Sequence, residues 1–140
     1  MYGKVKLAGL WEFGWSAPFN EYDLWGYLVQ EFEVMELIMS PVTGILRDVT
    51  EYPSLVQAVE RNPDYTPVVL DEHGEHILSS YQHPVNALYL FGKAGTSVMP
   101  LFDDPITVRV ETPKLLGGLW PHQVAGIVLH DRWIKHGSGD

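Results

Sequence analysis

The residues best suited to binding a ligand lie in the segment from Asn86 to Ser97. An apolar run of strand length, Ala87 to Phe91, is followed at once by Gly92 and shortly afterwards by Gly95. Open α/β sheets bind ligands at the carboxyl ends of their strands, where glycine lets backbone N–H groups approach a bound molecule closely. An apolar strand that ends in a tight turn is also ordinary architecture, so the segment alone leaves both interpretations open.

A second glycine-rich segment lies nearer the C-terminus. Residues 112–118 read Thr-Pro-Lys-Leu-Leu-Gly-Gly and follow an alternating apolar run, Ile106 to Val110, which predicts a strand. After them the apolar pattern predicts a last helix from Trp120 to Ile134, with Pro121 suited to its first turn. The two glycine-rich segments therefore each follow a predicted strand.

Metal and thiol chemistry are not indicated. The chain has no cysteine, which excludes disulfides, thiolate metal sites and cysteine nucleophiles. None of its six histidines forms the His-Glu-x-x-His pair of hydrolytic zinc sites. His73 and His76 lie on either side of a glycine in a predicted turn, and we interpret them as solvated. We therefore predict no metal site.

Size and composition indicate one folded domain. Of the 140 residues, 46% are hydrophobic and 19% are charged, which is typical of globular proteins. No apolar run approaches the roughly 20 residues that cross a bilayer. The N-terminal segment has neither a long apolar region nor a small-residue cleavage site, so we expect no signal peptide. The lack of cysteine fits a cytoplasmic location.

The net charge of the chain indicates how readily it could bind nucleic acid. A formal net charge of −9 counts against tight, nonspecific binding of nucleic acid by one subunit. It does not exclude a local basic patch. Six of the nine basic residues fall in terminal or glycine-loop segments: Lys4, Lys6, Lys93, Lys114, Arg132 and Lys135.

The first part of the chain predicts a β-α-β unit. A strand is expected from Val5 to Trp11, a helix over residues 21–33 with Asn20 as its N-cap, and a strand from Met35 to Met39. The helix has an apolar stripe formed by Leu24, Tyr27, Leu28 and Phe32. Two strands joined by a helix imply a parallel pair with a right-handed crossover.

The middle of the chain completes the predicted sheet. A loop from Ser40 to Tyr52 leads to a helix that starts at Ser54 and ends near Asn62 and Pro63, and Thr66 to Leu70 is the next strand. Residues 71–76 are turn-like, and residues 77–81 are extended or briefly helical. The sum is a single α/β domain over residues 1–136, with a mainly parallel sheet of five to six strands and flanking helices. Residues 137–140 form a polar tail.

Three segments match a known arrangement of motifs. One is a strand, Pro-x-Asn and a helix, here Leu10 to Phe32 with Pro18-Phe-Asn20. Another is an apolar strand ending in Phe-Gly before a further glycine, here Leu88-Tyr-Leu-Phe-Gly-Lys-Ala-Gly95. The third is a strand, a loop and a helix, here Val108-Arg-Val-Glu-Thr-Pro and then Leu119-Trp-Pro-His-Gln-Val-Ala-Gly-Ile-Val-Leu129. Together they resemble the SPOUT superfamily of RNA methyltransferases, and within it the minimal, single-domain TrmH-like (SpoU) 2′-O-methyltransferases.

The resemblance implies a fold, a cofactor and partners. It implies a C-terminal deep trefoil knot, S-adenosylmethionine (SAM) held in the knot by backbone groups of both glycine loops, and a homodimer whose interface admits an RNA nucleotide. A neutral adenine fits apolar walls and backbone partners. The cofactor contacts that the resemblance implies are Leu90, Phe91, Gly92, Lys93, Gly95, Val110, Thr112, Leu119 and Val124.

The chain also departs from the family pattern. In the TrmH-like branch a helix arginine is implicated in activating the ribose hydroxyl; the matching position is near Trp25, and residues 20–34 contain no arginine. The third motif of that branch has a polar Ser-x-Asn core, where this chain has Gly118-Leu119-Trp120. The scaffold and the cofactor site therefore transfer from the resemblance, and the catalytic mechanism does not.

Four residues are candidates for catalysis or substrate binding. His122 opens the last helix, where it either acts as the base or only packs and caps. Asn20 either orients the substrate or caps its helix. Arg47 and Arg132 either contact phosphate or are solvated surface residues.

Aromatic residues gather early in the chain. They either stack on a nucleotide base or form a core or dimer interface, and the acidic charge balance favours the second interpretation. These residues are Trp11, Phe13, Trp15, Phe19 and Trp25.

Two functions from different classes follow. The first is a SAM-dependent methyltransferase that acts on a tRNA or rRNA nucleotide, with the ribose 2′-oxygen as one option. The alternative is a knotted SAM-binding domain without methyltransferase activity, which serves as an interaction or structural module. A flavodoxin-like nucleotide-binding domain would need a phosphate loop after the first strand, and residues 12–18 offer one glycine and a bulky tryptophan.

Overall fold

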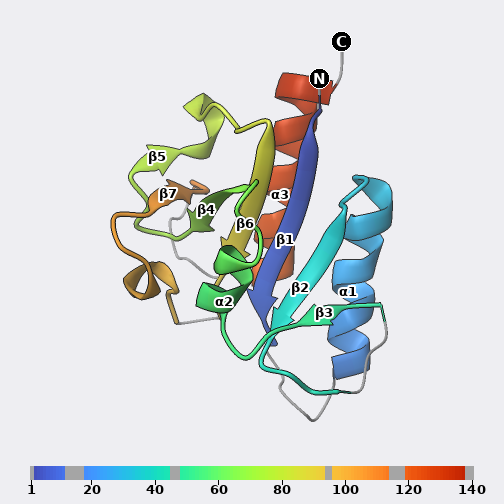
Figure 1. Cartoon of the computed structure of the whole chain (residues 1–140). Helices are drawn as coiled ribbons and strands as arrows, with labels where there is room; N and C mark the ends of the chain where they lie inside the picture. The colour runs from blue at the N-terminus through green and yellow to red at the C-terminus, as the bar shows by residue number, and fades with distance from the viewer. Residues whose placement is uncertain (1, 12–17, 45–47, 94–95, 114–118, 138–140) are drawn as a thin grey trace.

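The computed structural model describes residues 2–11, 18–44, 48–93, 96–113 and 119–137. Over these residues the chain forms a wholly parallel sheet of seven strands in the order β3-β2-β1-β6-β4-β7-β5 (Figure 1). The strands are β1 (Lys4–Leu10), β2 (Glu36–Ser40), β3 (Thr50–Glu51), β4 (Thr66–Leu70), β5 (His76–Ile77), β6 (Asn86–Phe91) and β7 (Ile106–Arg109).

Helices cover both faces of the sheet. Helices α1 (Pro18–Glu31) and α3 (Pro121–Arg132) lie on one face, and the short helix α2 (Leu55–Glu60) lies on the other (Figure 1). Two 3-10 turns, η1 (Leu78–Ser80) and η2 (Met99–Leu101), are part of the connections, and a π-helical turn, η3 (Trp133–Gly137), continues α3. Helix α2 begins at a capped end, because the Ser54 hydroxyl accepts a hydrogen bond from the backbone N–H of Gln57 at 3.2 Å.

The central strand β6 explains the continuous apolar run in the sequence. Its side chains alternate between two cores, and all five from Ala87 to Phe91 are at most 1% exposed. Tyr89 and Phe91 belong to the core under α1 and α3, whereas Leu88 and Leu90 belong to the core under α2. A parallel strand covered on both faces has no solvent side, so the apolar and polar alternation of half-buried strands is lost.

The predicted α/β class and the parallel sheet are confirmed, but the number of strands was underestimated. Seven strands are present in the described residues, because two edge strands have only two residues each. One of them, β3, lies inside the stretch from Ser40 to Tyr52 that the sequence predicts as a loop; Ile38 of β2 pairs with Thr50. Segments this short have no periodicity of their own and are defined by the strand beside them.

The ends of the helices also differ from expectation. Helix α1 begins at Pro18, so Asn20 lies within its first turn and is not the N-cap. Proline favours the first helical turn, where its missing N–H has no partner to lose. Helix α3 begins at Pro121 as expected, and its first turn is closed by the Gln123 side chain, which accepts a hydrogen bond from the Trp120 N–H at 2.8 Å. None of the described helices is long and apolar enough to cross a membrane.

Candidate functional site

All strands of the sheet end at one edge because they are parallel, and the candidate site lies at this carboxyl edge. Trp11, Gly92 and Val110 directly follow β1, β6 and β7. Helix α3 begins at the same edge and runs back along the sheet (Figure 1). Its first turn therefore lies near the ends of the strands, and its last turn lies near their beginnings.

An aromatic group links α1, β6 and α3 at the candidate site. The Trp25 indole, 1% exposed, meets the Phe91 ring edge to face at 5.6 Å between ring centroids and the His122 ring at 6.4 Å. His122 also approaches Trp120 at 6.3 Å. Gly9 of β1 lies against this indole, since a Cβ there would be in ordinary van der Waals contact with Trp25 Cζ2 at 3.5 Å. The structure thus brings two predicted site residues, Phe91 and His122, onto one tryptophan.

Trp25 was not among the predicted site residues. The sequence indicated it only as one of five clustered aromatic residues, and the core interpretation is confirmed for Trp11 and Trp25, which are buried. Phe13, Trp15 and the Phe19 side chain lie outside the described residues. The indole N–H of Trp25 is buried and has no hydrogen-bond partner in the described structure. Such unsatisfied donors are rare in folded proteins and cost free energy.

His122 is placed where it can accept a proton. Its ring is half-buried in the first turn of α3, and burial lowers its pKa below the ordinary value of 6.5. The positive end of the helix dipole also disfavours a cation at this position. The ring is therefore neutral at neutral pH, which is the form that a general base requires.

The loop that follows β6 closes on itself at Gly92. A Cβ at this position would lie 2.1 Å from the carbonyl oxygen of Thr96, so only glycine fits. The backbones of Lys93 and Thr96 are joined by two hydrogen bonds, of 3.2 and 3.0 Å. Gly92 is thus required for the turn itself. Gly95 lies outside the described residues.

A second group at the carboxyl edge is centred on Glu51, which the sequence analysis missed. Its carboxylate accepts hydrogen bonds from Trp11 Nε1 at 2.8 Å, from the hydroxyl and N–H of Thr43 at 2.7 and 3.1 Å, and from the N–H of Gly44 at 2.9 Å. Burial alone would raise the pKa of Glu51, but these hydrogen bonds outweigh it and lower the pKa. Glu51 thereby joins the end of β1 to the loop after β2. Trp11 is distant from Glu51 in sequence, so no local motif marks this group.

The remaining predicted cofactor contacts differ in accessibility. Leu90 and Phe91 are buried in opposite cores, so their side chains cannot contact a ligand and only their main chain can. The others are exposed or half-buried along the carboxyl edge and the start of α3: Lys93, Val110, Thr112, Leu119 and Val124. Two further predicted site residues are not described in full. Arg47, a predicted phosphate contact, lies outside the described residues, and the side chain of Asn20, the predicted orienting residue in α1, is not described.

The predicted phosphate contact of Arg132 is wrong. The side chain is fully buried, and its guanidinium donates hydrogen bonds to three backbone oxygens and one hydroxyl. These acceptors are Pro84 O, Tyr2 O, Val85 O and Tyr89 Oη, at 2.6, 2.5, 2.7 and 3.1 Å. Tyr2 and Val85 precede β1 and β6, so Arg132 lies at the edge of the sheet opposite the candidate site. An arginine held in this way fixes the fold and cannot reach a phosphate.

Two small cavities lie away from the aromatic group. One, of about 210 Å³, is lined by α1 and β2, with Tyr22, Met35 and Asp48 among its walls. The other, of about 280 Å³, lies between α3 and the segment around Leu78, and includes Val110. No group of three or more His, Asp or Glu side chains within the described ranges is arranged to hold a metal ion.

Comparisons with known proteins give a match in structure only. No family model matches the sequence, and no curated protein matches it. A Bacillus anthracis protein described provisionally as an RNA methyltransferase has a TM-score of 0.72 and 14% identity, over 96% of each chain. A structure concerned with the 2-OH methylation of C/U34 on tRNA has a TM-score of 0.73 and 12% identity, over 95% of this chain and 96% of that one.

A third match carries a cofactor. The SpoU methyltransferase AviRb from Streptomyces viridochromogenes, in complex with AdoMet, has a TM-score of 0.73 and 16% identity, over 99% of this chain and 59% of that one. At these identities the likeness establishes the fold. The chain has the SpoU-type methyltransferase fold, and the resemblance inferred from its motifs is confirmed at that level. Function must be argued from the site.

Proposed function

We propose that this chain, which has the fold of the SpoU or TrmH-like SPOUT methyltransferases, is a SAM-dependent methyltransferase that acts on RNA. The observation that carries the proposal is the combination of that fold over nearly the whole chain with a neutral, half-buried histidine at the carboxyl edge of the sheet. The described SpoU neighbour with AdoMet supports the choice of cofactor.

The residues at the carboxyl edge fit an adenosyl group. Half-buried Val110 and Val124 and exposed Leu119 offer apolar contact, and the carbonyl oxygen of Lys93, which already accepts from the Thr96 N–H, has a second lone pair for a polar partner. Apolar walls with a few polar partners are what an uncharged purine requires. We infer that the main chain after β6 and β7 and the start of α3 hold the cofactor. We also propose that the chain carries the C-terminal trefoil knot that the resemblance implies.

The reaction needs one proton acceptor. Bound SAM supplies a methyl group attached to a positively charged sulfur. As the substrate oxygen forms its bond to the methyl carbon, the carbon–sulfur bond breaks and the hydroxyl releases its proton. We propose that the neutral ring of His122 takes up this proton, because it lies at the start of α3 beside the proposed cofactor site. Trp25 and Trp120 orient the ring.

We propose the ribose 2′-hydroxyl of a tRNA nucleotide as the first substrate to examine. The neighbour concerned with 2-OH methylation of C/U34 on tRNA supports this choice. Methyl transfer from labelled SAM to unmodified tRNA and rRNA transcripts, followed by digestion to nucleosides, tests it. We expect label in a 2′-O-methylnucleoside. Label in the base of a nucleoside would show that an atom of the base is methylated and not the ribose oxygen. SAM binding without any methyl transfer would favour the second function below.

The second candidate function is a SAM-binding module without methyltransferase activity. Two observations favour it: residues 20–34 contain no arginine, and Arg132, one of two predicted phosphate contacts, is buried. The net charge of −9 also gives RNA little electrostatic attraction. Both functions require cofactor binding, so the methyl-transfer assay separates them.

We also propose that the chain forms a homodimer through the outer faces of α1 and α3. Large apolar side chains are exposed on these helices and on η3, which continues α3: Tyr27 on α1, Ile127 on α3 and Ile134 on η3. Contiguous exposed apolar surface is typical of protein interfaces. Sedimentation analysis should give twice the chain mass of 15.8 kDa, and Ile134→Lys should shift the protein to monomer. A wild-type monomer at all accessible concentrations would contradict the proposal.

A further inference from the structure

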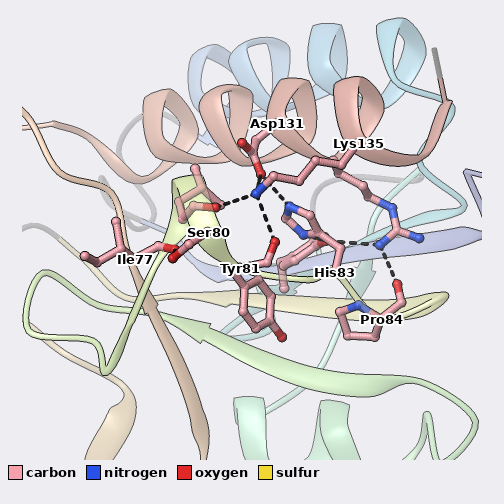
Figure 2. Close-up of polar contacts among 10 residues, drawn as sticks. Ile77, Ser80, Tyr81, His83, Pro84, Asp131 and Lys135 are labelled. Atoms are coloured by element: carbon pink, nitrogen blue, oxygen red, sulfur yellow. Dashed lines mark hydrogen bonds and ion pairs between the residues drawn. The ribbon is translucent and has the colours of Figure 1, made fainter. Parts of the chain in front are cut away.

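A buried polar cluster lies at the edge of the sheet opposite the candidate site, where α3 ends. We call it the His83 network. It connects the segment before β6, β6 itself, and the junction of α3 with η3 (Figure 2). Its members are His83, Tyr89, Asp131, Arg132 and Lys135.

The hydrogen atoms of the His83 network can be assigned from its chemistry. The Asp131 carboxylate only accepts, so the His83 Nε2–H must donate to Asp131 Oδ2, which lies 2.7 Å away. A neutral imidazole has one N–H, and its Nδ1 must then accept the hydroxyl hydrogen of Tyr89 at 2.6 Å. The Tyr89 oxygen in turn accepts from Arg132 Nη1 at 3.1 Å. The bonds therefore run in one direction, from Arg132 through Tyr89 and His83 to Asp131.

The same network fastens the end of α3 to the rest of the fold. Lys135 donates to Asp131 Oδ2 at 2.8 Å and to the backbone oxygens of Leu78 and Tyr81 at 2.6 and 2.9 Å (Figure 2). Arg132 adds its hydrogen bonds to backbone oxygens that precede β1 and β6. The end of α3 and the start of η3 are thus held by Arg132 and Lys135, and the Asp131 carboxylate binds both Lys135 and His83.

We propose that the His83 network is a pH-sensitive latch, which holds the end of α3 against the segment 78–85 while His83 is neutral and releases it when His83 gains a second proton. A proton on Nδ1 would turn the acceptor of the Tyr89 hydroxyl into a donor, so the Tyr89 hydrogen would lose its acceptor. It would also add a buried positive charge beside two cations. One carboxylate, Asp131, would then face three positive charges, of which those of His83 and Arg132 are fully buried and repel each other.

The surroundings of His83 are consistent with this proposal. The groups that face it from its own segment, from β6 and from α3 with η3 are Tyr81, Tyr89, Asp131, Arg132, Lys135 and His136. Burial lowers the pKa of His83, the nearby cations Lys135 and Arg132 lower it further, and Asp131 opposes them. The network is therefore stable above the ordinary pKa of 6.5 and loses stability as the pH falls below that value.

Amide hydrogen exchange measured against pH tests the latch in the full chain without any cofactor. After correction for intrinsic exchange, the protection factors of the amides in residues 128–136 and 78–85 should fall as the pH is lowered below the ordinary histidine pKa of 6.5. The fall should be up to about tenfold for each pH unit. His83→Gln, which cannot titrate, should remove this fall. His130→Gln replaces an exposed histidine on the same helix and should behave as wild type. A wild type with constant protection, or an equal fall in a folded His83→Gln variant, would overturn the proposal.

A second measurement on the wild type does not depend on any variant. Histidine ¹⁵N spectra at mildly alkaline pH should show His83 as the neutral Nε2–H form, with Nδ1 as acceptor. The opposite tautomer, or a doubly protonated ring at that pH, would contradict the assigned direction of the network and so the latch. Because neither experiment contains SAM or RNA, their failure leaves the proposed methyltransferase function untouched.

Discussion

The indole of Trp25 and the imidazole of His122 meet edge to face, with 6.4 Å between their ring centroids and 69° between their planes. Trp25 also contacts Phe91, the last residue of the central strand. One buried side chain thus sets the position of the proposed base relative to the end of β6. This contact connects the first helix, which the sequence presents as an ordinary amphipathic segment, with the proposed chemistry.

We expect His122→Ala to lower the rate of methyl transfer by about a hundredfold or more, because a positioned base contributes at least that much. Its SAM affinity should change little, since the proposed cofactor contacts are mainly backbone groups. His130→Ala, on the exposed side of the same helix, should keep the wild-type rate. Single-turnover rates and calorimetry on the three proteins give the comparison. An unchanged rate in His122→Ala would remove this residue from the mechanism.

The pH dependence of that rate follows from burial of His122. Because its pKa is lowered, the ring is neutral over a wider range than a free histidine. The wild-type rate should therefore rise with pH and reach half its maximum below pH 6.5. A half-maximal rate well above that value would show that another group takes up the proton.

Trp25→Ala should lower the free energy of unfolding by about 3–5 kcal/mol, because it leaves a large cavity among α1, β1 and β6. Trp25→Phe should cost less, since it fills part of the space and removes the unsatisfied indole N–H. Tyr27→Ala, on the same helix and 69% exposed, should stay within about 0.5 kcal/mol of wild type. Urea unfolding measures all three. If Trp25→Ala and Tyr27→Ala lowered the free energy of unfolding equally, Trp25 would not be the residue that holds this core together.

Two glycine substitutions should have opposite effects. Gly92→Ala places a Cβ against the Thr96 carbonyl and should destabilise the protein by more than about 1 kcal/mol. Gly26→Ala, where no atom lies within 4 Å of the new Cβ, should stabilise α1 by about 0.5–1 kcal/mol. Thermal unfolding of both variants checks the pair. If Gly92→Ala were as stable as wild type, the described loop closure would be wrong.

Glu51→Gln should weaken the joint between β1 and the loop after β2. We expect a loss of about 1–2 kcal/mol at neutral pH, because hydrogen bonds to a charged acceptor are replaced by neutral ones and the site is partly exposed. Because the pKa of Glu51 is lowered, its charged carboxylate stabilises the fold above pH 4.5, the ordinary pKa of a glutamate. This stabilisation is lost as the pH falls through the lowered pKa of the folded protein. Unfolding curves should show a smaller acid-dependent loss in Glu51→Gln than in wild type. The same acid dependence in both proteins would count against this assignment.

Much of the fold could be predicted because its long elements carry their own patterns. The apolar run from Ala87 to Phe91 and the helical stripe in α1 mark buried elements whatever their partners are. The strands β3 and β5, with two residues each, could not be predicted in the same way. Their hydrogen bonds come from a neighbouring strand that is distant in sequence, as between Thr50 and Ile38.

The site was predicted less completely for a related reason. Glycine loops and a histidine at a helix start are local signals, and these identified Gly92 and His122. The structural role of Arg132 depends on hydrogen-bond acceptors that lie 43 to 130 residues away, from Tyr89 to Tyr2. Its sequence position therefore looks like that of any surface arginine. The contacts of Glu51 with Trp11 and of His83 with Asp131 likewise exist only in the folded chain.

Titration calorimetry of the purified chain with SAM and with S-adenosylhomocysteine tests the central claim most directly. The account predicts saturable binding of both compounds, at one molecule per chain, at the carboxyl edge of the sheet. It also predicts that Gly92→Ala weakens this binding while Gly26→Ala leaves it unchanged. No binding of either compound by the folded wild-type protein would contradict the proposed cofactor site, and with it both functions that depend on it.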